Sequence, residues 1–126
     1  MRKIMLAVDG TESSMKAAEK TADLMTQASE ITMVNVIEEA VKEEQLKENV
    51  QKMMERAAAY FEEKNFKVNT EIHYGHPAEI ICKLAEEDEY DLIVVADRGD
   101  EGRRFLLGST SDRVIRYAKT SVLVVK

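Results

Sequence analysis

The chain has 126 residues, a length that fits one domain spanning 1–126, and 44% of them are hydrophobic, which is enough to form a core. Its formal net charge of −6 argues against a general nucleic-acid-binding protein, because phosphate contacts need clustered Lys and Arg. No apolar run approaches the roughly 18 residues that a membrane-spanning helix needs, and the N-terminus becomes polar too early for a signal peptide. We therefore expect a cytoplasmic protein with no nucleic-acid or membrane partner.

The first half of the chain alternates short apolar runs with helical patterns. Residues 4–8 are a continuous apolar run that ends at Asp9, which predicts a buried strand followed by a turn. Residues 15–25 have helical spacing, 31–36 predict a second strand, and roughly 41–64 predict one long amphipathic helix. The apolar stripe of that helix comprises Leu46, Val50, Met53, Met54, Ala57, Ala58 and Phe61.

The second half continues the same alternation. Residues 66–74 alternate strictly between apolar and polar side chains, which predicts a strand with one solvated face or an edge position. A proline at the start favours a helix over about 77–88, and the apolar run 90–96 predicts a central strand. A helix over about 109–118 and a final strand over 121–126 complete the pattern.

Cysteine and histidine, which often act as nucleophiles or metal ligands, are few in this sequence, with one cysteine and two histidines. The single cysteine, Cys82, falls inside an apolar helical pattern, which favours a small buried hydrophobic residue over a nucleophile. His73 and His76 lack the neighbouring acids and cysteines that a metal site needs. Neither a P-loop nor a G-x-G-x-x-G motif follows the first strand. We therefore predict no metal site and no catalytic residues.

Strand–helix alternation with four crossovers implies an α/β protein with a parallel sheet covered by helices on both faces. Ligands in such sheets bind beyond the carboxyl ends of the strands, where the strand order reverses. Asp9 follows the first strand, where it fits either an acceptor for a ligand hydroxyl or amine, or a residue that stabilises the turn before the first helix. The sequence leaves both roles open.

The loop after the fourth strand has features of a phosphate site. Gly99 and Gly108 allow backbone amides to approach a ligand closely, and Ser109 is a good N-cap for a helix whose free amides attract anions. Asp100 and Glu101 in the same loop repel a phosphate. The stretch therefore fits either a nucleotide site or a well-capped helix that binds nothing.

Five segments occur together in this chain: IMLAVDGTESS, GHPAEII, YDLIVVADRG, LLGSTSDRVIRYA and SVLVVK. In combination they resemble the single-domain UspA type of universal stress protein over essentially the whole sequence. The resemblance implies an open five-stranded parallel sheet of order 3-2-1-4-5, Rossmann-like and similar to the adenine nucleotide alpha hydrolases. It also implies a homodimer that acts in stress adaptation and, in members with Gly-x2-Gly-x9-Gly-Ser/Thr after strand four, bound ATP or AMP, with Mg²⁺ if ATP.

The resemblance also implies a set of nucleotide-binding positions in this chain. It puts Asp9 near the ribose, Val36 beside the adenine, and Thr110 and Ser111 at the phosphates. The full set is Asp9, Val36, Ala96, Gly99, Gly108, Ser109, Thr110 and Ser111. The chain departs from the family pattern twice, because Ala96 replaces the first glycine and only eight residues separate Gly99 from Gly108. We expect a weakened adenine-nucleotide site with at most slow ATP hydrolysis; the alternative is an interaction module that binds no nucleotide.

The implied strand order makes the third and fifth strands the edges of the sheet. Glu71 and a polar face guard the third strand, whereas Val122, Leu123, Val124 and Val125 leave the fifth unguarded. We therefore expect a homodimer in which the terminal strands pair antiparallel about a two-fold axis. The sequence identifies no client protein.

Overall fold

The computed structural model describes residues 2–38, 44–97 and 109–126. Strands and helices alternate along it: β1 (Lys3–Ala7), α1 (Glu12–Leu24), β2 (Glu30–Ile37), α2 (Glu44–Glu63), β3 (Lys67–Tyr74), α3 (Pro77–Glu87), β4 (Leu92–Ala96), α4 (Ser109–Tyr117) and β5 (Ser121–Val125). The strands pair in parallel in the order β3-β2-β1-β4-β5, which confirms the expected α/β sheet and its strand order.

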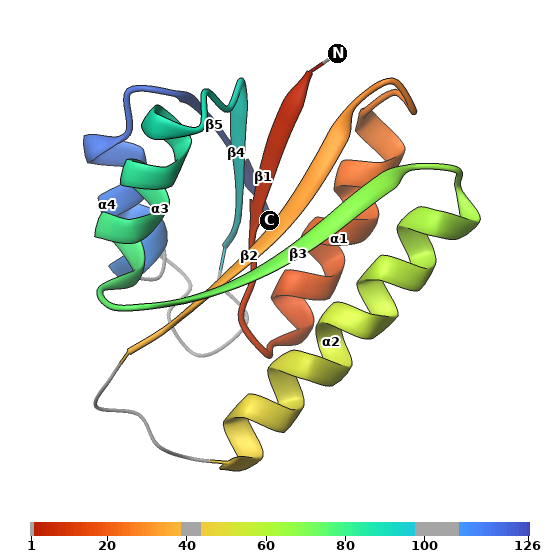
Figure 1. The fold of residues 1–126 in the computed structure, drawn as a ribbon, viewed down its shortest axis with the longest axis horizontal. Coiled ribbons are helices and arrows are strands. Elements are labelled where there is room, and N and C mark those ends of the chain that lie inside the picture. Colours follow the sequence, from red (N-terminus) through yellow and green to blue (C-terminus); the bar gives the residue numbers. More distant parts are fainter. Residues whose placement is uncertain (1, 39–43, 98–108) are drawn as a thin grey trace.

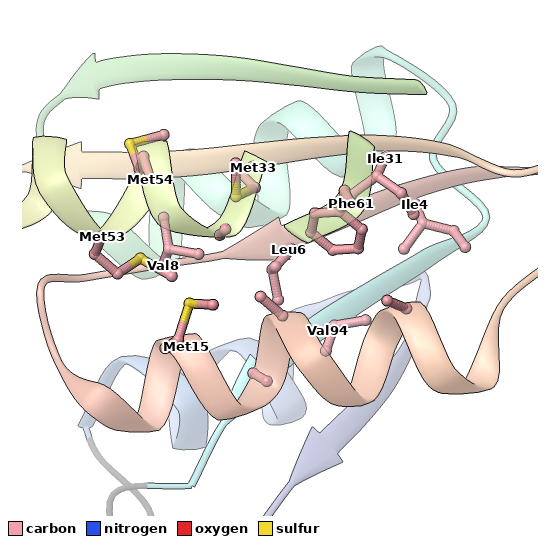
Figure 2. Close-up of a cluster of buried hydrophobic side chains, with 14 of the residues drawn as sticks. Ile4, Leu6, Val8, Met15, Ile31, Met33, Met53, Met54, Phe61 and Val94 are labelled. Carbon is pink, nitrogen blue, oxygen red and sulfur yellow. The ribbon is translucent and has the colours of Figure 1, made fainter. Parts of the chain in front are cut away.

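Helices cover both faces of the sheet, as Figure 1 shows. One core lies between the sheet and α1 and α2, and it includes Ile4, Leu6, Met33 and Phe61 (Figure 2). The other lies between the sheet and α3 and α4, and it is built around residues such as Val34. The two cores follow from the alternation of side chains along each central strand, which directs neighbouring residues to opposite faces.

The long helix α2 packs through the predicted stripe, with one exception. Val50, Met53, Ala57 and Phe61 are among its buried residues. Leu46 was predicted to belong to the same stripe, but it is 41% exposed. Leu46 lies in the first turn of α2, where it lines a hollow at the carboxyl end of the sheet instead of packing on a strand.

Both edge strands, β3 and β5, expose apolar side chains to solvent, whereas the sequence suggests this only for β5. On β3, Glu71 bonds to His73 at 2.8 Å, while Ile72 and Tyr74 are 46% and 60% exposed. The edge position of β3 is confirmed. The face of β3 that carries Ile72 and Tyr74 is partly in solvent, and the protection of this edge by its polar residues stays a prediction. On β5, Val125 is buried in the core of its own chain.

Cys82 lies on α3 and packs against the core between the sheet and α3 and α4, as predicted, although its side chain is only half-buried. Burial raises the pKa of its thiol above the ordinary value. A thiol with a raised pKa stays protonated at neutral pH, and the protonated form is a poor nucleophile.

Candidate functional site

The carboxyl ends of β1, β2 and β4 and the start of α4 surround a hollow of about 110 Å³. It lies where the strand order reverses between β1 and β4, the place where ligands bind in open α/β sheets. Five of the positions expected to bind a nucleotide line it: Asp9, Val36, Ala96, Thr110 and Ser111. Ser109 begins α4 and is exposed, and Gly99 and Gly108 lie outside the described residues.

Asp9 stabilises the turn between β1 and α1 through one carboxylate oxygen. Its Oδ1 accepts hydrogen bonds from Thr11 N at 3.0 Å, from Thr11 Oγ1, and from Ser14 Oγ at 2.8 Å. Thr11 is in turn the N-cap of α1 and accepts from Ser14 N. The other oxygen, Oδ2, accepts no hydrogen bond from the described residues. The turn role is therefore present, and it leaves one oxygen for a ligand.

Ala96 holds the position where the family pattern has its first glycine. It ends β4, pairs with Val125 of β5, and is not among the described residues with positive φ. Its backbone is therefore one that any residue adopts, so the methyl group adds no backbone strain. This departure from the family pattern does not by itself damage the site.

The start of α4 is tied to the end of β4. Ser111 Oγ donates to Ala96 O at 3.0 Å, and the Ser111 side chain is buried. The resemblance implied that Ser111 faces a phosphate, but its hydroxyl proton is already used within the protein. The first-turn backbone amides of α4 have no partner within the helix, so they are the groups left to bind an anion at the rim of the hollow.

Val36 lines the hollow, and its backbone N–H and C=O are directed toward it. β1 and β2 pair as far as Ala7 and Val34, and Val8 N donates to Val34 O at 2.9 Å. Beyond that point β2 continues to Ile37 and pairs only with β3. Because residues two apart on a strand direct their backbone groups to the same side, the N–H and C=O of Val36 point past the end of β1.

Asn35 is a site residue that the sequence analysis missed. It lines the hollow, its Nδ2 donates to Val8 O at 2.9 Å, and its Oδ1 is buried and has no hydrogen-bond partner among the described residues. The only signal in the sequence is an amide side chain inside the mostly apolar run 31–36.

A second hollow of about 440 Å³ continues from the first toward the start of α2. Asp9, Asn35, Val36 and Pro77 line both hollows. Gly10 forms part of its wall, where an added Cβ would lie 3.1 Å from the Cβ of Asn49 on α2. The glycine thus permits the close approach of α2 to the β1–α1 turn.

Two further findings concern metal ligands and membrane-spanning helices. Among the described residues, no three His, Cys, Asp or Glu side chains are grouped so that they could hold a metal ion. None of the helices in the described ranges is both long and apolar enough to span a bilayer.

Comparison with known proteins agrees with the fold. The sequence pattern of the universal stress protein family matches residues 1–126. The chain belongs to this family. Universal stress protein MJ0531 of Methanocaldococcus jannaschii is 32% identical over 139 residues, which cover 99% of this chain and 82% of the relative.

Solved structures of other family members share the architecture. The structure of MJ0577 from Methanocaldococcus jannaschii is 32% identical, covers 99% of this chain and 95% of that one, and superposes with a TM-score of 0.84. A universal stress protein family member from Arabidopsis thaliana, solved with AMP bound, is 20% identical and has a TM-score of 0.80, with 100% of this chain and 92% of that one covered. At that identity the likeness concerns the fold.

Proposed function

We propose that this family member is a stress-response regulatory module that binds an adenine nucleotide, ATP or AMP, in the hollow at the carboxyl edge of the sheet. The observation that carries the proposal is the free backbone edge of Val36, which shares the hollow with Asp9 and the start of α4. These three elements come from different parts of the chain and match the three parts of a nucleotide.

Each element has the chemistry that its part of the nucleotide requires. The N–H and C=O of Val36 form a donor–acceptor pair that complements the ring nitrogen and amine at the edge of adenine. Asp9 Oδ2 is an acceptor for a ribose hydroxyl. The first-turn amides of α4 attract the negative phosphate groups, aided by the helix dipole. AMP in the Arabidopsis thaliana family member is consistent with a ligand of this class.

If ATP is the ligand, Mg²⁺ would be held mainly by phosphate oxygens and water, as is usual for this ion. The hollow of about 110 Å³, called the central hollow below, has one carboxylate among its described lining residues, that of Asp9. The protein therefore supplies few ligands for the metal. The site therefore suits a nucleotide that binds as a complex with Mg²⁺.

We assign a binding role and not an enzymatic one. Hydrolysis of ATP needs a group that orients water or removes its proton. Asp9 Oδ1 already accepts hydrogen bonds from Thr11 and Ser14, which hold the carboxylate in the turn. This arrangement suits a carboxylate that accepts a hydrogen bond from a bound ribose.

Calorimetric titration with ATP and with AMP tests the proposal. We expect a Kd of about tens of micromolar for both nucleotides, since the amides at the start of α4 would contact the phosphate nearest the ribose, which ATP and AMP share. Asp9→Asn keeps an oxygen for the turn and replaces the ribose acceptor, so it should weaken AMP binding about tenfold. No heat and no thermal shift at millimolar nucleotide would instead identify a module that binds no nucleotide.

A homodimer through β5 is the second part of the proposal. β5 is an edge strand, and Val122, Leu123 and Val124 are half-exposed. Val125 O accepts from Asp97 N at 2.7 Å, so Val125 and Leu123 direct their backbone groups toward β4, and Val122 and Val124 direct theirs outward. An antiparallel second copy would therefore bond to Val122 and Val124.

This geometry selects the variant that tests the dimer. Val124→Pro removes an outward N–H without removing a bond to β4, so it should convert a dimer into a monomer in sedimentation velocity experiments. Thr70→Pro is the matched control, because Gly75 N donates to Ile37 O and the backbone of Thr70 therefore points outward from β3. Dissociation by Thr70→Pro and not by Val124→Pro would place the interface at the other edge.

A further inference from the structure

Asn35 lies where β1 and β2 separate. In a regular parallel ladder, the bond from Val8 N to Val34 O would be followed by one from Val36 N to Val8 O. The structure has the first of these bonds, at 2.9 Å, but in place of the second, Asn35 Nδ2 donates to Val8 O at 2.9 Å. The side chain of Asn35 therefore ends the ladder and leaves the backbone edge of Val36 open to the hollow.

The same contact fixes which way the amide points. Nδ2 must face the carbonyl of Val8, because the reverse orientation would place two oxygens against each other. Oδ1 is thereby the group left over, and it accepts no hydrogen bond from any residue that the structure describes, although Asn35 is only 4% exposed. A buried acceptor without a donor destabilises the fold, so the presence of Oδ1 at this place points to a ligand that supplies the donor.

The position of Asn35 indicates which donor that is. Asn35 and Val36 both line the central hollow and its extension toward α2. A base that bonds to the backbone edge of Val36 therefore lies next to the amide of Asn35. Only an N–H or O–H group can bond to Oδ1, because Oδ1 has no hydrogen to offer.

We propose that Asn35 determines the base specificity of the nucleotide site, with Oδ1 accepting an N–H of the exocyclic amine of adenine. This inference rests on the proposed function. The exocyclic amine has two N–H groups, of which one bonds to the carbonyl of Val36 and the other to Asn35 Oδ1. Hypoxanthine and guanine carry a carbonyl oxygen at the same ring position, and that oxygen would face two acceptors. The site therefore discriminates against them both by a lost bond and by repulsion.

The test compares AMP with IMP, which differ in this group and in the proton on the adjacent ring nitrogen, by calorimetric titration of the wild type and three variants. We expect the wild type to prefer AMP by at least about tenfold and Asn35→Ala to prefer it at least about threefold less strongly than the wild type does, since the backbone of Val36 still favours adenine. Asn35→Asp keeps an acceptor and loses the donor to Val8, so it should be less stable but retain most of the preference. Asn49→Ala is the matched control, because Asn49 lines the extension toward α2 but is exposed, and it should match the wild type.

Each result bears on the inference. An unchanged preference in folded Asn35→Ala would overturn it, and would show that Oδ1 binds a buried water instead. A wild type that binds neither nucleotide would overturn the proposed function as well, whereas AMP binding without preference over IMP would overturn the role of Asn35 and the pairing of the base with Val36 but not nucleotide binding itself. If Asn35→Ala does not fold, the wild type is titrated with an AMP derivative whose amine carries two methyl groups. This ligand has no N–H to donate, so it should bind no better than IMP, and binding equal to that of AMP would refute the inference.

Discussion

Phe61 is the largest fully buried side chain among the described residues, and its removal gives a quantitative test of how α2 packs on the sheet. Its ring lies edge-on to Phe66, with centroids 5.7 Å apart and an interplanar angle of 76°. Figure 2 shows the ring among Ile4, Leu6 and Ile31 of the sheet. The side chain is 0% exposed, so Phe61→Ala loses both the burial of the ring and the contacts of its neighbours.

The expected loss is about 3–5 kcal/mol of unfolding free energy, the range for truncation of a buried phenylalanine. About 0.5–1.5 kcal/mol of this comes from the aromatic pair with Phe66. A domain of this size has a total stability of about 5–15 kcal/mol, so the variant should lose at least about a fifth of it. Urea denaturation measures the effect, and the midpoint should fall by about 2 M at a typical slope.

Glu48→Ala is the control, because Glu48 lies on the solvent side of the same helix. Its cost should stay within about 0.5 kcal/mol, as for most surface substitutions. Comparable losses from both variants, or a loss below about 1 kcal/mol for Phe61→Ala, would refute the packing described for α2.

Three further predictions concern the site and the pH dependence of stability. Gly10→Ala places a Cβ 3.1 Å from Asn49 Cβ and 3.3 Å from Val50 N, so it should displace the start of α2 and cost about 1–3 kcal/mol in urea denaturation. Ala96→Gly restores the glycine of the family pattern without relieving strain, so its AMP affinity should stay within about twofold of the wild type, and a tenfold gain would contradict the negative φ. Burial raises the pKa of Tyr90 above its ordinary value of 10.0, so the folded chain holds this proton more tightly than the unfolded chain. Stability from this group is full below about pH 10 and decreases above it, and Tyr90→Phe should show a shallower alkaline loss in thermal denaturation followed across that pH range.

The sequence alone determined the elements and much of the site. Helix and strand periodicities are local properties, so 31–36 and 90–96 could be recognised as strands without knowledge of their neighbours. The resemblance to the family added the strand order. Once the carboxyl ends of parallel strands meet at one edge, Asp9 and Ala96 must lie near each other, and they line one hollow.

Tertiary structure decided which polar atoms remain free at that edge. The hydrogen bond from Asn35 to Val8 joins residues 27 positions apart, and it depends on the register of β1 against β2, which no local pattern encodes. In the same way, the contact of Ser111 with Ala96 removes a hydroxyl that the sequence offered to a phosphate. A side chain's chemistry can be read from its type, but its availability depends on whether a distant partner already satisfies its hydrogen bonds.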